Sequence, residues 1–164
     1  MQTFLDFKEL LNSNEEIVLN ELSLSYKRSI QLNDPQYMKL NSSLKVSNLL
    51  RNIWETDQLD VRESFYLLCF STSLDLVGYQ KISEGGMDAV LVDLRLLFSI
   101  ALLSRASSIV VAHNHPSGTL KPSEADKILT NRIVRGGELL SLQLNDHIIL
   151  TQSGYYSFRD EGLL

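Results

Sequence analysis

Two nearly continuous apolar runs constrain the fold of this chain more than any other feature. The first extends from Glu63 to Ser71 and the second from Ala106 to Ala112. Runs with so little polar alternation are typical of central strands that are covered on both faces. The sequence therefore predicts a sheet that is flanked by helices.

Weaker patterns place the other elements around these two strands. Helical spacing or helix-start signals mark three segments after residue 44, namely 45–54, 91–104 and 122–135, the last of them ending at Gly136-Gly137. Further strands are predicted over residues 76–82 and 142–150. Strands and helices thus alternate loosely, which favours the α/β class with a central sheet between helices.

The first 44 residues and the C-terminal tail give less regular patterns. A short amphipathic helix is predicted over residues 1–15, a strand over 17–26 and a polar connector over 27–44. We therefore divide the chain into an N-terminal extension, residues 1–44, and one domain, residues 45–164. In the tail, Tyr155, Tyr156 and Phe158 are interpreted as core packing in preference to a surface for stacking bases.

Charge and composition limit the classes of partner. The net charge of −5 argues against a broad basic surface and against strong non-specific binding of nucleic acid. No apolar run approaches the roughly 20 residues of a membrane span, and the first residues lack the layout of a secretory signal. The single cysteine, Cys69, lies in an apolar run and is expected to be a buried thiol, so we expect a cytoplasmic protein.

The chemistry of the chain is concentrated around two of its three histidines. His113 and His115 follow the second apolar run, and Asp126 comes eleven residues after His115. On an extended backbone, side chains at i and i+2 point to the same side, so the two imidazoles can converge on one ion. Two imidazoles and one carboxylate form a ligand set that zinc accepts while a fourth position stays open for water. The pattern therefore favours a hydrolytic metal site.

A structural interpretation of the same residues remains open at this level. Ser123-x-x-Asp126 is also the pattern of a capping box, in which Asp126 would only accept hydrogen bonds from the start of a helix. His113 and His115 could likewise be two polar loop residues. The metal interpretation is preferred because the two halves occur together.

The spacing His113-x-His115-x7-Ser123-x2-Asp126 resembles the JAMM motif of the JAB/MPN-domain metallopeptidases. Its surroundings are similar to the RadC-like branch of that family, over about residues 44–164. The matching stretches are Ala112 to Gly118, Lys121 to Ser123 and Leu144 to Ile149. The resemblance implies a three-layer architecture like that of cytidine deaminases, with a mixed sheet between helices.

The resemblance also implies roles for individual residues. One zinc ion per chain would be bound by His113, His115 and Asp126, and Ser123 would donate a hydrogen bond to the oxyanion. The glutamate of the motif, which acts as general base, falls on Glu63. Glu55 and Glu84 are competitors by composition, and Glu63 is preferred because it lies just before the first long strand. His147 is interpreted as a hydrogen-bonded strand residue in preference to a ligand.

Three functions are therefore weighed. The leading one is a zinc-dependent peptidase or isopeptidase-like hydrolase acting on a peptide or protein. The second is a metal-dependent DNA-processing or DNA-repair factor, which the absence of a Gly-rich hairpin pattern in residues 1–44 makes doubtful. The third is a binding module without catalysis. A zinc nucleobase deaminase is excluded because its Cys-x-x-Cys cannot come from one cysteine. A homodimer could form through residues 17–26 as an added strand.

Overall fold

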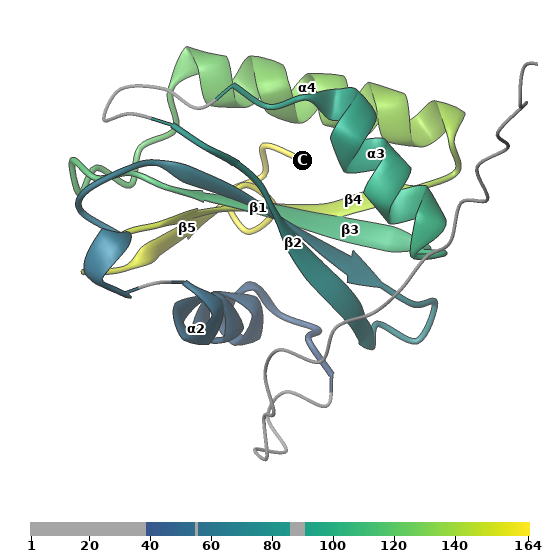
Figure 1. The fold of residues 1–164 in the computed structure, drawn as a ribbon, viewed down its shortest axis with the longest axis horizontal. Coiled ribbons are helices and arrows are strands. Elements are labelled where there is room, and N and C mark those ends of the chain that lie inside the picture. Colours follow the sequence, from purple (N-terminus) through teal and green to yellow (C-terminus); the bar gives the residue numbers. More distant parts are fainter. Residues whose placement is uncertain (1–38, 55, 86–90) are drawn as a thin grey trace, which may run out of the picture.

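The computed structural model describes residues 39–54, 56–85 and 91–164. Its centre is a five-stranded mixed sheet in the order β2-β1-β3-β4-β5, with β1 at Ser64–Phe70, β2 at Leu76–Glu84, β3 at Ser108–Asn114, β4 at Gln143–Leu150 and β5 at Tyr155–Ser157. Helix α2 (Ser43–Ile53) covers one face of the sheet (Figure 1). Helices α3 (Leu94–Leu103) and α4 (Glu124–Leu139) lie on the other face. This three-layer α/β arrangement confirms the predicted fold class.

The strand pairing places the first apolar run against the second. β1 is antiparallel to both β2 and β3, and Phe65 pairs with His113. β3 and β4 are parallel, with Val111 opposite His147, and α4 forms the crossover between them. Every residue of β1 and of β3 is buried, as expected for central strands with helices on both faces.

Alternate residues of these strands feed two separate cores. On the α2 side, Tyr66, Leu68 and Phe70 of β1 pack in one cluster with Leu49 and Leu50. On the opposite side, the other residues of the same strand, Phe65, Leu67 and Cys69, pack with Leu97 of α3 and Ile133 of α4. The thiol of Cys69 is buried, as predicted. Because side chains alternate across a strand, the face that holds Phe65 also holds His113.

Two predicted boundaries were wrong by a few residues. The helix expected from Leu91 begins at Leu94, because the Asp93 side chain caps it by accepting from the backbone N–H of Arg95. The strand expected over 106–112 is Ser108–Asn114. His113 therefore lies within the strand, where pairing on both sides fixes its backbone, and not just beyond its end.

The predicted end of α4 at Gly136-Gly137 was also wrong, since the helix continues to Leu139. A Cβ atom on Gly136 would lie 2.6 Å from the ring of Phe98, and one on Gly137 would lie 2.3 Å from the carbonyl oxygen of Leu142. The two glycines therefore allow close approach to α3 and to the start of β4. Ser141, with a φ of 53°, takes the left-handed conformation after the helix.

The remaining predictions divide between confirmed elements and undescribed residues. The helix predicted over residues 45–54 is α2, and the strand predicted over 76–82 is β2, which is two residues longer. Part of the C-terminal tail forms β5, a strand that was not predicted, while Phe158 is buried as expected. The helix expected over 1–15 and the strand over 17–26 lie outside the described residues. Within the described residues, no helix has both the length and the apolar character needed to cross a membrane.

Candidate metal centre

The end of β3 positions the two histidines of the motif. His113 is held by β1 on one side and by β4 on the other, and only 1% of its surface is exposed. His115 has left the strand, but its backbone N–H still donates to the carbonyl of Leu150 at 3.1 Å. The chain then turns, and Gly118 at the turn has a φ of 75°. The i, i+2 relationship of the histidines is thereby kept across the end of the strand.

The first turn of α4 positions the carboxylate. The Ser123 hydroxyl accepts from the backbone N–H of Asp126 at 3.1 Å, and the Asp126 carboxylate accepts from the backbone N–H of Ser123 at 2.7 Å. These reciprocal bonds form the capping box that the sequence pattern had left as the structural alternative. Capping does not move Asp126 away from the histidines, because its side chain is buried beside them.

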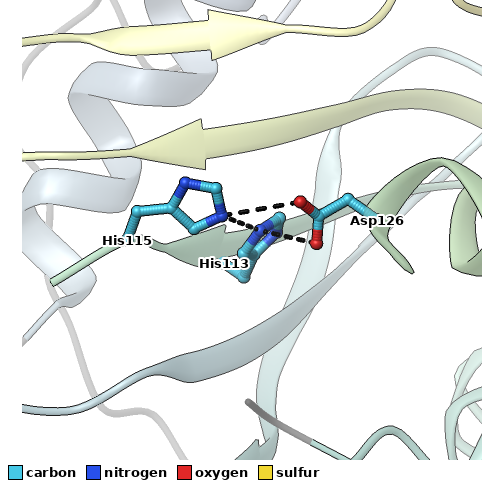
Figure 2. Close-up of side chains that lie close together, drawn as sticks. All are labelled: His113, His115 and Asp126. Carbon is cyan, nitrogen blue, oxygen red and sulfur yellow. Dashed lines mark hydrogen bonds and ion pairs between the residues drawn. The ribbon is translucent and has the colours of Figure 1, made fainter. Parts of the chain in front are cut away.

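The three side chains meet at one point (Figure 2). The Nε2 atoms of His113 and His115 are 3.0 Å apart. Asp126 Oδ1 lies 3.2 Å from His113 Nε2, and Asp126 Oδ2 lies 3.5 Å from His115 Nε2. One ligand atom from each residue can be chosen so that all three lie within 4.8 Å of one another.

The donor set fits a divalent metal ion. His115 Nδ1 is 2.7 Å from the carbonyl oxygen of Thr119, which can only accept, so Nδ1 carries the proton and a neutral His115 presents a bare Nε2. That lone pair faces a carboxylate and a second imidazole, an arrangement that a cation would stabilise. Nitrogen and carboxylate ligands together suit zinc.

Electrostatics keep the carboxylate of this cluster ionised. Burial alone would raise the pKa of Asp126, but the adjacent imidazoles of His113 and His115 outweigh it and lower the pKa well below its usual range. The pKa of His115 is raised, first by its contact with the Asp126 carboxylate and against the effect of burial. The cluster therefore favours a positive charge between the imidazoles and the carboxylate.

Glu63 lies at the same edge of the site. It directly precedes β1, and continuing the pairing of Phe65 with His113 by two residues places Glu63 opposite His115. Burial raises the pKa of Glu63, while the nearby imidazoles of His113 and His115 partly oppose that increase. A half-buried carboxyl with a raised pKa beside a metal cluster is suited to transferring protons.

The competitor Glu84 is not part of this arrangement. Glu84 is exposed, and it forms ion pairs with Arg62 at 2.6 Å and with Lys81 at 2.8 Å. Its pKa is lowered, first by the hydrogen bond from Lys81. Glu55 lies outside the described residues.

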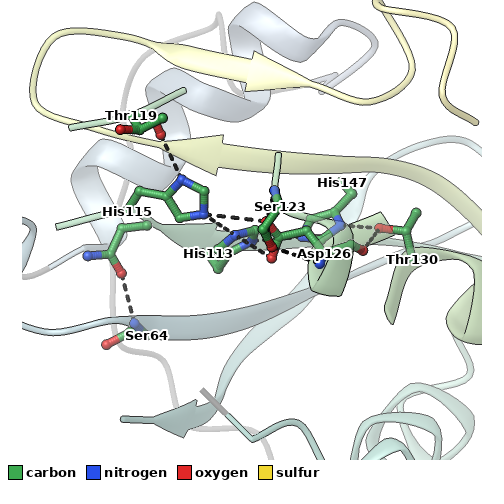
Figure 3. Close-up of polar contacts among 9 residues, drawn as sticks. Ser64, His113, His115, Thr119, Ser123, Asp126, Thr130 and His147 are labelled. Atoms are coloured by element: carbon green, nitrogen blue, oxygen red, sulfur yellow. Dashed lines mark hydrogen bonds and ion pairs between the residues drawn. The ribbon is translucent and has the colours of Figure 1, made fainter. Parts of the chain in front are cut away.

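Two residues that the sequence reasoning missed support the site. Asn114, between the two histidines, is fully buried and binds the segment that carries Glu63. Its amide donates to the carbonyls of Leu59 and Arg62, and its oxygen accepts from the backbone N–H of Ser64 at 2.8 Å. Thr130, one turn after Asp126, contacts His147 at 2.6 Å (Figure 3). An asparagine between two candidate ligands was the available sequence signal for Asn114, whereas Thr130 gave none.

His147 has the hydrogen-bonded role that was preferred for it. Its Nε2 atom lies 2.8 Å from His113 Nδ1, and the residue is completely buried. Burial and the nearby His113 lower the pKa of His147 well below its usual value, so this imidazole is neutral. His147 therefore contacts the cluster through His113 Nδ1, the ring nitrogen remote from Asp126, and offers no ligand atom to a metal ion.

Comparison with known proteins agrees with the geometry. A family model described as RadC-like JAB domain matches residues 40–163. A UPF0758 protein of Flavobacterium johnsoniae is 42% identical over 101 residues, covering 62% of this chain and 44% of that protein. Another, from Thermotoga maritima, is 37% identical over 126 residues, covering 77% of this chain and 55% of that protein. The chain thus spans about half the length of these curated relatives.

Proposed function

Because the chain belongs to the RadC-like JAB domain family, we propose that it is a zinc-dependent hydrolase of amide bonds in a peptide or protein. The observation that carries this proposal is the convergence of His113, His115 and Asp126 beside the half-buried Glu63. Neither the family match nor the names of the relatives supply an activity. The proposal therefore rests on the chemistry of these four side chains.

The first three side chains would hold one zinc ion. Each would use the atoms that already converge, namely the two Nε2 atoms and the Asp126 carboxylate. When bound, zinc supplies Lewis acidity and makes a water molecule a better nucleophile near neutral pH.

Glu63 would move the proton. As general base its carboxylate takes a proton from the attacking water, and as general acid it passes that proton to the departing amine. Its raised pKa brings the acid and base forms closer in free energy at neutral pH, which both halves of this role require.

Ser123 would stabilise the developing oxyanion. Its hydroxyl now donates to Asp126 Oδ2, so it must turn away from that oxygen to donate to a substrate. The backbone N–H of Ser123 donates to the same oxygen and would keep Asp126 in place while the hydroxyl turns. Ser123 is exposed, which gives a substrate access to the hydroxyl.

The deciding experiment compares two glutamate variants. Protein purified without chelator is analysed for zinc and incubated with a peptide and isopeptide library. Glu63→Gln should keep zinc and the fold but lose hydrolysis, because an amide cannot accept the proton of water. The control is Glu84→Gln, whose ion pairs lie on the surface, and it should hydrolyse like the wild type. The proposal fails if Glu63→Gln retains hydrolysis, or if the protein does not take up zinc when it is supplied.

A further inference from the structure

A chain of three short contacts runs from the backbone of α4 to the back of His113 (Figure 3). The Thr130 hydroxyl lies 2.6 Å from the carbonyl oxygen of Asp126 and 2.6 Å from His147 Nδ1. His147 Nε2 then lies 2.8 Å from His113 Nδ1. Each contact is short enough to need one proton between its two heavy atoms.

Counting protons fixes the direction of this chain. The carbonyl oxygen of Asp126 can only accept, so the single hydroxyl proton of Thr130 must point to it. The Thr130 oxygen is then an acceptor, and His147 must donate from Nδ1. His147 is completely buried, and its ring contacts a hydroxyl, an imidazole and two aromatic rings, surroundings that disfavour a charged imidazole. Its Nε2 is therefore an acceptor, and the proton in the third contact belongs to His113 Nδ1.

The reverse direction leaves one contact without a proton. If the Thr130 hydroxyl donated to His147 Nδ1, two oxygen atoms, those of Thr130 and of the Asp126 carbonyl, would face each other at 2.6 Å. Bare oxygens at that distance repel each other. The observed geometry is therefore compatible with only one direction.

We propose that Thr130 and His147 are positioning residues that hold His113 as its Nδ1–H tautomer, so that a bare Nε2 lone pair faces His115 and Asp126. This rests on the proposed function in so far as that lone pair is meant for zinc. Neither residue would contact metal or substrate. Both would act through the orientation and the tautomer of His113.

Packing keeps the ring of His147 in the orientation that this role needs. The ring stacks on Phe158 with a centroid distance of 4.6 Å and an interplanar angle of 15°. A second aromatic ring, that of Phe65, is tilted against it in a T-shaped arrangement at a centroid distance of 5.8 Å. A ring flip, which would put Cδ2 and Cε1 in the places of Nδ1 and Nε2, would require these aromatic neighbours to move, so both ring nitrogens stay on their partners.

The test uses a matched pair of substitutions at the hydroxyl. Thr130→Val preserves shape and removes the acceptor of His147 Nδ1–H, whereas Thr130→Ser keeps it. Without that acceptor, His147 should protonate on Nε2 and push the proton of His113 from Nδ1 to Nε2. Nitrogen-15 NMR of the histidine rings in zinc-free protein reports the tautomers, and competition with a chromophoric chelator reports zinc affinity.

We expect Nδ1–H at His113 in the wild type and in Thr130→Ser, and Nε2–H in Thr130→Val. Zinc affinity should fall roughly 10–100-fold in Thr130→Val and change by less than about twofold in Thr130→Ser. Thermal unfolding of both variants separates this effect from a general loss of stability, which would not move the tautomer.

The proposal is overturned if His113 in the folded wild type carries its proton on Nε2. It is equally overturned if Thr130→Val keeps the wild-type tautomer and the zinc affinity of Thr130→Ser. A wild-type protein that binds no zinc would defeat the proposed function, but the tautomer measurement would still decide the role of Thr130 and His147.

Discussion

The backbone N–H and the hydroxyl of Ser123 both donate to one oxygen of Asp126, Oδ2, each at 2.7 Å. The backbone N–H of Asp126 returns a bond to the Ser123 hydroxyl. A motif that begins a helix is therefore also the motif that orients a candidate ligand. Substitutions at this pair should affect stability and chemistry to different extents.

Ser123→Ala should lower the free energy of unfolding by about 1 kcal/mol, the usual effect of removing a helix cap. Hydrolysis should fall further, by roughly 10²-fold or more, if the hydroxyl also stabilises the oxyanion. Urea denaturation and steady-state kinetics separate the two effects. Ser123→Thr keeps the hydroxyl and should retain most of the stability. If the alanine variant loses stability but no activity, Ser123 only caps the helix and does not stabilise the oxyanion.

Asp126→Asn should abolish zinc binding while α4 remains folded. The amide oxygen can still accept from the backbone N–H of Ser123, but a neutral amide is a poor zinc ligand. Zinc content and circular dichroism measure the two outcomes. The control is Glu124→Gln in the same helical turn, where the side chain is 83% exposed and pairs with Lys127. Equal zinc content in both variants would exclude Asp126 as a ligand.

Gly137→Ala should destabilise the protein, although alanine is the better helix former by about 1 kcal/mol. The new Cβ would meet the backbone carbonyl of Leu142 at 2.3 Å, and relieving such an overlap typically costs about 1–3 kcal/mol. Asn131→Ala, at an exposed position of the same helix, controls for helix propensity and should be neutral or stabilising. The measurement is the denaturation midpoint of each variant relative to the wild type. A Gly137→Ala variant more stable than the wild type would contradict the close approach of Gly137 to the Leu142 carbonyl.

Asp146 should make the protein less stable as pH rises, the opposite of the usual effect of a carboxyl group. Burial raises the pKa of Asp146 even though Ser157 and two backbone N–H groups donate to its carboxylate. Because the folded state prefers the protonated acid, the contribution of this residue to stability is full below its unfolded pKa. This contribution is lost as the pH rises from the pKa of Asp146 in the unfolded chain through its pKa in the folded protein. Asp146→Asn should therefore gain stability relative to the wild type across that interval in urea titrations at successive pH values. A constant difference would contradict the raised pKa.

Duplex DNA should bind weakly, and its affinity should fall steeply with salt, since the chain carries a net charge of −5. Binding titrations at low and physiological salt measure this, with DNA and amide substrates assayed in parallel. DNA nicking that disappears in Glu63→Gln, without amide cleavage, would favour the DNA-processing alternative. Activity on neither substrate would favour a binding module.

The sequence predicted the layers of the fold because strands and helices are encoded in patterns of neighbouring residues. The unbroken apolar run before Ser71 and the run before His113 each belong to strands that are buried on both faces. The capping pattern of Ser123 likewise located the first turn of α4. In these places the residues that decide the structure are neighbours in the chain.

Two other features depend on residues that are distant in the sequence, namely the end of α4 and the contact of Thr130. Gly136 and Gly137 read as a helix end, and only the positions of Phe98 and of the Leu142 carbonyl show that they permit close packing. Thr130 is an ordinary helix residue until β4 brings His147 beside it. The sequence suggested a shared site for His113, His115 and Asp126, and the structure brings them together, but their roles as ligands stay predictions.

The crossover through α4 has a consequence for how the chain folds. Asp126 and Thr130 lie on the helix that connects β3 to β4, the parallel pair among the described strands. Parallel pairing across such a connection is slow, because the closure entropy of the intervening segment is paid before the strands make contact. His113 and His147, 34 residues apart, meet only when that step is complete. A zinc ion that binds His113, His115 and Asp126 in the folded state would stabilise the native chain by mass action.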